Sequence, residues 1–266
     1  KNWMVAINNA FNTNIIGLKI EGNDIQPLEM IMPLQSKSLS STRIIVVIGE
    51  KTNWEFLQVF LGSNKSAHST ILEIYLEEKA TVKHGVVALG DKDANLLAYL
   101  AIDQENQSNY NLTTLQHNWD LCRFESKIIQ KAGNAKTNIK GLQISKNNQQ
   151  AAMHSLVRFN GPEGQLDQLQ KAIASEVSHC IFNGAIHVPK IAQRTNASQL
   201  SRNLLISERA RIDTKPELEI VADDVKCSHG ATVTQLQDEE LFYLRSRGIK
   251  INDATALLLK GYCEEI

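Results

Sequence analysis

The chain has 266 residues and a formal net charge of −1 at pH 7; 42% of its residues are hydrophobic and 21% are charged. A near-neutral charge argues against a dedicated nucleic-acid-binding protein, and no apolar run is long enough for a membrane-spanning helix. Aromatic residues are few (7 Phe, 5 Tyr and 3 Trp), whereas Asn occurs 22 times. A core of this size must therefore be filled by Ile, Leu and Val. Because the chain begins at Lys1 in what resembles the middle of a sequence, we expect an N-terminal helical region to be absent from it.

Most of the chain alternates apolar and polar residues with a period of two, which predicts half-buried strands. The best examples are residues 43–48, 69–76, 85–89, 112–116 and 180–188. Short turns rich in Gly, Asn, Ser and Asp lie between such segments, as at 22–24, 62–64 and 133–134. Short strands without long helical crossovers leave three architectures open: a β-sandwich, a β-barrel or a β-helix.

Composition favours the β-helix among these three, although it leaves the other two open. Sandwich and barrel cores commonly use large aromatic residues, whereas a β-helix stacks aliphatic side chains from coil to coil. Stacked Asn side chains in the turns can also pair their amides along the axis. No strict short repeat is visible, so any coils must be irregular.

Two regions depart from the period of two. Residues 164–177 carry Leu166, Leu169, Ile173 and Val177 at helical spacing, which predicts one helix inserted among the strands of a core spanning residues 1–234. Residues 235–266 predict a C-terminal helical subdomain. Its first helix begins with Asp238 as cap and ends at Gly248.

The second C-terminal helix is predicted to be capped by Asn252 or Asp253. Ala254, Leu257, Leu258 and Tyr262 would face inward from it. Two short helices cannot bury themselves fully, so we expect them to form a small knob on the β body, with apolar surface left for a partner.

The four cysteines, Cys122, Cys180, Cys227 and Cys263, are scattered and match neither a disulfide scaffold nor a self-contained zinc site. In a strand, Cys227 and His229 would share one face with Cα atoms about 6.5 Å apart, given a rise of ~3.3 Å per residue. Two ligands do not make a metal site, and a buried Cys beside a hydrogen-bonded His explains the pattern equally well. No Gly-rich phosphate loop is present, which argues against nucleotide hydrolysis by this chain.

Three blocks, at residues 216–220, 222–232 and 241–249, carry a family resemblance. In this order they resemble the SufB/SufD family of the SUF iron–sulfur cluster assembly system. The segments 182–184, 192–195 and 203–205 agree with it. Gly230 stands where the SufB branch carries Glu, so the chain is most similar to the SufD branch, while Thr234 departs from an expected Gly.

The resemblance implies a mainly β protein: a right-handed parallel β-helix with a small C-terminal helical subdomain. It implies a non-catalytic scaffold in the cytoplasm, or in the plastid stroma for a plant or algal protein, with ATP hydrolysis in the partner SufC. His229 and Cys227 would take part in cluster assembly and metal binding at a β-helix interface with SufB. No cofactor is expected to bind stably to the chain alone, and the cluster would be transient.

The SufC partner is expected on the C-terminal helices, and the isolated chain could form a homodimer. The expected SufC contacts are Leu241, Phe242, Tyr243, Leu244, Arg245, Arg247, Leu257 and Leu258. Two alternatives remain: a SufB-like subunit that binds a cluster itself, and a polysaccharide-active β-helix enzyme. The second lacks a recognisable groove of clustered acidic and basic residues.

Overall fold

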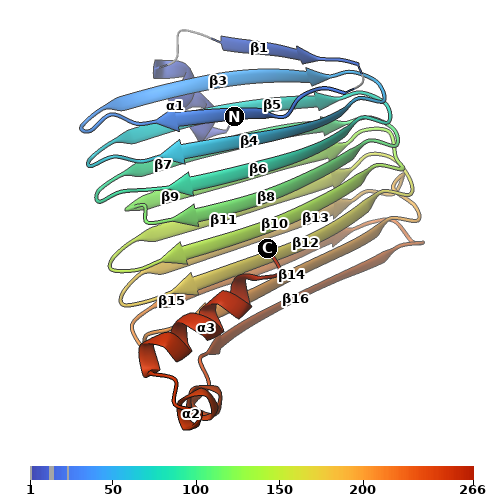
Figure 1. The fold of residues 1–266 in the computed structure, drawn as a ribbon. Coiled ribbons are helices and arrows are strands. Elements are labelled where there is room, and N and C mark those ends of the chain that lie inside the picture. Colours follow the sequence, from blue (N-terminus) through green and yellow to red (C-terminus); the bar gives the residue numbers. More distant parts are fainter. Residues whose placement is uncertain (1, 12–14, 23) are drawn as a thin grey trace.

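A computed structural model describes residues 2–11, 15–22 and 24–266. These residues form a coiled stack of parallel strands, with one helix near the first coils and two helices that follow the last strand (Figure 1). The helices are α1 (Trp3–Phe11), α2 (Asp238–Ser246) and α3 (Ile251–Cys263). The strands are β1 (Ile15–Ile20), β2 (Leu28–Pro33), β3 (Leu39–Ile48), β4 (Asn53–Leu61), β5 (Ala67–Leu76), β6 (Thr81–Leu89), β7 (Asn95–Gln104), β8 (Asn109–His117), β9 (Leu121–Gln130), β10 (Lys136–Ser145), β11 (Gln150–Phe159), β12 (Gln165–Ala174), β13 (His179–Val188), β14 (Asn196–Leu205), β15 (Arg211–Ile220) and β16 (Lys226–Gln235).

The strands form two 8-stranded sheets, one of the odd-numbered and one of the even-numbered strands. Each strand pairs in parallel with the second strand along the chain, so one coil consists of one odd and one even strand. Leu72 lies beside Leu100 in the next coil, whereas Gly184 lies beside Pro216, so the coil length varies around 30 residues. The prediction of a mainly β protein built as a parallel β-helix is therefore confirmed.

The turns repeat more regularly than the side chains do. In the first half of the molecule a non-glycine residue with positive φ recurs every 14 residues: Lys37, Lys51, Lys65, Lys79, Asp93 and Gln107. The backbone N–H of such a residue donates to the next turn of the stack; Lys51 N–H, for example, bonds the carbonyl of Glu78 at 3.0 Å. Of the turn predicted at 22–24, Asn23 lies outside the described residues.

The interior combines aliphatic columns with buried polar side chains. The column of Ile44, Leu72 and Leu100 agrees with the prediction from composition. Polar side chains such as Gln58 and His84 in the early coils and Gln199 in a late one are also buried, and that part of the prediction was wrong. The buried glutamines are Gln58, Gln104, Gln116, Gln130, Gln143, Gln149, Gln168, Gln170 and Gln199.

The predicted helix at 164–177 is a strand, β12. Its inner face carries Leu166, and its outer face carries Leu169 and Ile173. Apolar residues on both faces of a strand mimic helical spacing, because the alternation on which the distinction depends is lost. Lys171 also lies on the outer face and is buried there under α3, which explains why this strand is covered on both sides.

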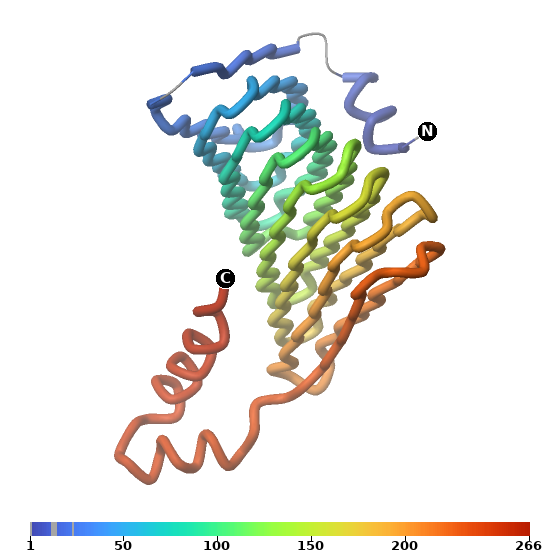
Figure 2. Tube along the Cα trace, turned by 90° about the vertical axis from the view of Figure 1, so that its right-hand side faces the viewer, coloured from blue at the N-terminus to red at the C-terminus, as the bar shows by residue number. Residues whose placement is uncertain are grey.

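The two C-terminal helices form where the sequence predicts them, but their first residues differ. Gln237 and Lys250 occupy the N-cap positions, and neither makes a side-chain capping bond, so the predicted caps Asp238 and Asn252 or Asp253 were wrong. Gly248 adopts positive φ just after α2, as a helix-ending glycine should. The pair extends away from the last coil and turns back along the sheet (Figure 2).

Candidate functional site

The last coil, formed by β15 and β16, ends the stack. Each of the two strands pairs on one side only, with β13 and β14 respectively. Their inner faces, which in earlier coils are buried, are half-buried or exposed here. Both strands therefore present unpaired backbone groups and an uncovered inner face, the arrangement to which another β structure can add.

Cys227 and His229 lie on this uncovered inner face. Cys227 lies beside Ala197 and His229 beside Gln199, and both neighbours are buried inside the β-helix. Ser228, between them, belongs to the opposite, outer face. The Cys227 side chain is half-buried, whereas His229 is exposed. Cys227 and His229 share one face, as expected for residues two positions apart in a strand. Because the β-helix ends here, no further coil covers these side chains.

Burial raises the pKa of the Cys227 thiol, while a hydrogen bond with the Ala197 backbone acts in the opposite direction. The thiol is therefore protonated at neutral pH and must release a proton to become a metal ligand. Within residues 2–11, 15–22 and 24–266, no group of three or more His, Cys, Asp or Glu side chains could hold a metal ion. Cys227 and His229 are thus a pair and do not form such a group by themselves.

The other cysteines lie elsewhere. Cys122 and Cys180 are buried in the interior, and burial raises the pKa of both thiols, that of Cys180 to about 11. Cys263 is half-buried near the end of α3. The free thiols of Cys122 and Cys180 are thus shielded from solvent, and that of Cys263 only in part.

The second candidate surface is the helix pair. Phe242 and Tyr243 on α2 are 71% and 58% exposed. The expected contact residues Arg245 and Arg247 are also exposed, whereas Leu241, Leu244 and Leu258 are half-buried. Leu257 was expected to face inward but is 51% exposed; Ala254 is the one residue of α3 that is buried.

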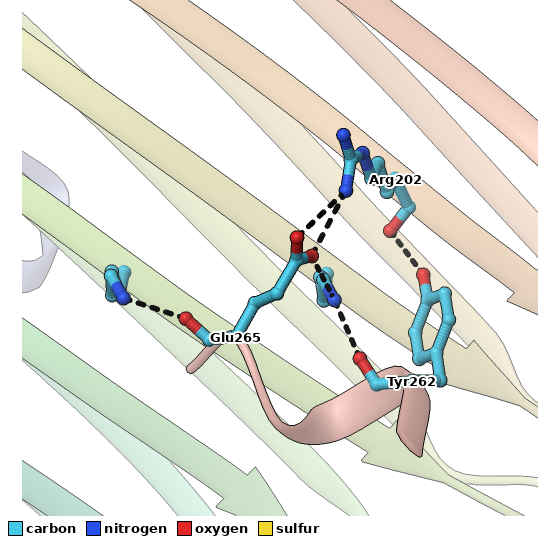
Figure 3. A network of polar contacts seen from close by, with 5 residues as sticks. Arg202, Tyr262 and Glu265 are labelled. Atoms are coloured by element: carbon cyan, nitrogen blue, oxygen red, sulfur yellow. Dashed lines mark hydrogen bonds and ion pairs between the residues drawn. The ribbon is translucent and has the colours of Figure 1, made fainter. Parts of the chain in front are cut away.

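A polar network that sequence reasoning missed ties α3 to the even-numbered sheet (Figure 3). The Glu265 carboxylate bonds Lys171 Nζ at 2.6 Å and Arg202 Nη1 at 2.9 Å. The Tyr262 hydroxyl donates to the Arg202 carbonyl at 2.6 Å, and Lys140 Nζ donates to the Glu265 carbonyl at 2.6 Å. We call these five residues the C-terminal clasp. Its members are far apart in sequence, so no local pattern indicates it.

Comparison with known proteins gives one family. The family model for the SUF system FeS cluster assembly, SufBD core domain, matches residues 32–262. An iron–sulfur cluster assembly SufBD family protein of Synechocystis is 43% identical over 75% of this chain and 44% of its own length. Protein ABCI7, chloroplastic, of Arabidopsis thaliana is 31% identical over 87% of this chain and 50% of its own.

The SufD protein of Escherichia coli is 48% identical over 37% of this chain and 23% of its own length. The chain thus spans about half the length, or less, of these curated relatives. In the part of the chain that the structure describes, no helix has the length and apolar character needed to cross a membrane.

Proposed function

Because this chain belongs to the SufBD family of the SUF iron–sulfur cluster assembly system, we propose that it is a non-catalytic scaffold subunit of the SufD type. It supports cluster assembly and transfer together with SufB and the ATPase SufC. The cluster is the cargo of this scaffold and not a resident cofactor. We assign the function to the cytoplasm, or to the plastid stroma if the protein comes from a plant or an alga.

The observation that carries the proposal is the open end of the β-helix. Two potential ligands, Cys227 and His229, lie on a face that is uncovered, and β16, the strand that carries both, has a free edge. A SufB β-helix docking against β15 and β16 would cover this face and bring the missing ligands. Incomplete ligation by each subunit suits assembly, because a fully enclosed cluster could not be released.

The helix pair is the proposed SufC-binding surface. Phe242 and Tyr243 expose large aromatic side chains next to Arg245 and Arg247, a combination enriched at protein interfaces. The absence of a phosphate-binding loop from the sequence agrees with ATP hydrolysis in SufC. If SufC moves the helix pair during ATP hydrolysis, this movement would be passed to the open end of the β-helix through the short segment between β16 and α2.

The central test is anaerobic cluster reconstitution with SufB and SufC. We expect His229→Ala to reduce the cluster yield by about tenfold or more, in the range seen when metal-site groups are lost. Cys227→Ala should give a smaller loss. The control is Ser228→Ala, which changes the same strand on its outer face and should leave the yield unchanged. An unchanged yield for His229→Ala would remove this residue from the mechanism.

A second measurement tests the SufC surface. Phe242→Asp places a charge in the proposed contact and should abolish co-purification of SufC, while SufB is retained. Glu239→Gln, on the same helix and also exposed, is the control. Retained SufC binding would move that interface elsewhere. Colour and cluster absorbance in the chain without SufB would instead indicate a subunit that binds a cluster by itself.

A further inference from the structure

Gln199 is the direct neighbour of His229 inside the β-helix. The two residues are register partners on adjacent strands β14 and β16 and share the inner face. Adjacent strands lie about 4.8 Å apart, so neighbouring side chains on one face are within reach of each other. Gln199 is 1% exposed, and its Oε1 is buried without a hydrogen-bond partner. A buried acceptor without a partner is costly and needs an explanation.

The other side of the Gln199 amide is fixed by a chain of hydrogen bonds. Gln199 Nε2 donates to Gln168 Oε1 at 2.9 Å. Gln168 Nε2 in turn donates to Ser155 Oγ at 2.8 Å. Because Gln168 lies on β12, on the far side of β14 from β16, the Gln199 amide points its N–H toward the interior. Its Oε1, on the other arm of the amide, takes no part in this chain of bonds.

A glycine on the opposite sheet makes room for this arrangement. A Cβ added at Gly184 would lie 2.3 Å from Gln199 Nε2. Any larger residue at this position would displace the amide. The φ of Gly184 is not in the left-handed region, so space, and not backbone conformation, is what this position requires.

We infer that Gln199 is a positioning residue for His229: its Oε1 accepts the N–H of one ring nitrogen of His229. The inference rests on the proposed function for the role of His229. The bond forms when the exposed His229 side chain rotates toward the interior, where Oε1 has no other partner.

The chemical consequence is a fixed tautomer. A neutral imidazole has one N–H and one lone pair, and the group that accepts the N–H decides which nitrogen carries the lone pair. Ligating histidines commonly donate their other N–H to a carbonyl or carboxylate oxygen. With Gln199 as acceptor, the second nitrogen of His229 presents its lone pair toward the open end, where the cluster would be assembled.

The test uses ¹⁵N NMR of the full-length protein labelled with ¹⁵N-histidine, at a pH where the ring is neutral. The His229 signals are identified by their loss in His229→Ala. We expect one tautomer to predominate in the wild type, and Gln199→Leu to reduce the tautomer ratio at least threefold. Gln199→Glu keeps an acceptor oxygen and should restore the ratio. The matched control is Gln143→Leu, which removes another fully buried glutamine, from β10, away from His229.

An unchanged tautomer ratio in Gln199→Leu overturns the inference. A wild-type ratio equal to that of free histidine also overturns it, and that measurement does not depend on whether a variant folds. In reconstitution with SufB and SufC, Gln199→Leu should lower the cluster yield about tenfold, and Gln143→Leu less than twofold. If His229→Ala leaves the yield unchanged, the proposed role of His229 in assembly fails, whereas the tautomer result still decides whether Gln199 contacts His229.

Discussion

His84 is an ionisable residue buried completely inside the β-helix. Its Nε2 donates to Gln58 Oε1 at 3.1 Å, because an amide oxygen can only accept, and its Nδ1 accepts from the Tyr110 hydroxyl at 2.7 Å. The ring also stacks on Phe56, with centroids 5.0 Å apart. Burial lowers the pKa of His84 to about 3, and burial likewise lowers that of His68 to about 4. Both rings are therefore neutral in the folded protein.

These histidines make the fold sensitive to acid. Below the unfolded pKa of about 6.5, the unfolded chain binds a proton at each site that the folded chain does not. Stability is thus complete above that pH and falls by about 1.4 kcal/mol per pH unit for each histidine. We expect His84→Gln to be less stable than the wild type at pH 7.5, but to lose about 2 kcal/mol less between pH 7.5 and 5.0. Urea unfolding at the two pH values measures this, and equal losses would contradict it.

For single residues, the sequence predicts which face of a strand a side chain lies on better than it predicts whether that face is exposed. The period of two correctly places Cys227 and His229 on one face of a strand. It cannot show that this strand is the last of its sheet, because that depends on pairing with residues some 30 positions away. Gln199 shows the same limit: its register partner is distant in sequence, and a glutamine between Ser198 and Leu200 carries no local sign of its burial.

At the scale of the element, the turns contain a 14-residue repeat that the sequence does not reveal. The position with positive φ is filled by Lys four times, then by Asp and Gln, so the repeat is one of conformation and not of residue type. Residues other than Gly, Asn and Asp pay a conformational cost of about 1–2 kcal/mol there. The stacked backbone hydrogen bonds between turns hold them in that conformation.

Lys65 offers a direct test of this strain, since its φ is 56°. We expect Lys65→Val to lower the free energy of unfolding by about 1–2 kcal/mol, because a β-branched side chain tolerates this region poorly. Lys65→Asn should be neutral or slightly stabilising. Lys127→Val, on the exposed face of β9, is the control and should change little. Equal effects of Val at positions 65 and 127, measured by denaturant unfolding, would show that the turn conformation carries no cost.

The wrongly predicted helix at 164–177 belongs to the same scale. Alternation identifies a strand only when one face meets solvent. In β12 one face lines the interior, and on the other face Lys171 lies against Tyr262 of α3. Lys171 and Ile173 are buried on this outer side, and Leu169 is half-buried. The strands with one solvent-facing side, such as β6 and β8, were predicted correctly for the same physical reason.

At the scale of the whole molecule, the C-terminal clasp determines where the helix pair sits. Lys171 is buried and has both the Glu265 carboxylate and the Tyr262 carbonyl as partners. These pairs join β12 and β14 to residues near the end of the chain, and the Lys171 and Arg202 ion pairs with Glu265 lower the pKa of its carboxyl. The clasp thus restrains the surface that we propose for SufC.

Loosening the clasp should free α3 without unfolding the β-helix. We expect Glu265→Gln to speed amide hydrogen exchange in α3 about fivefold, because the side chain loses its ion pairs with Lys171 and Arg202. Exchange in β5 to β11 should not change. Glu264→Gln alters the neighbouring exposed carboxylate and serves as the control. Equal exchange in the two variants, followed by mass spectrometry, would show that the clasp does not hold the helix.

Because the coils stack in parallel register, the number of coils sets the length of the molecule. Each coil adds one strand spacing, about 4.8 Å, to the distance between helix α1 and the open end. Removing a whole coil, such as residues 67–94, would join strands that already share the same register and direction. A chain of this kind can therefore change its length in evolution in steps of one coil. The distance between the first coils and the open end would change by the same step.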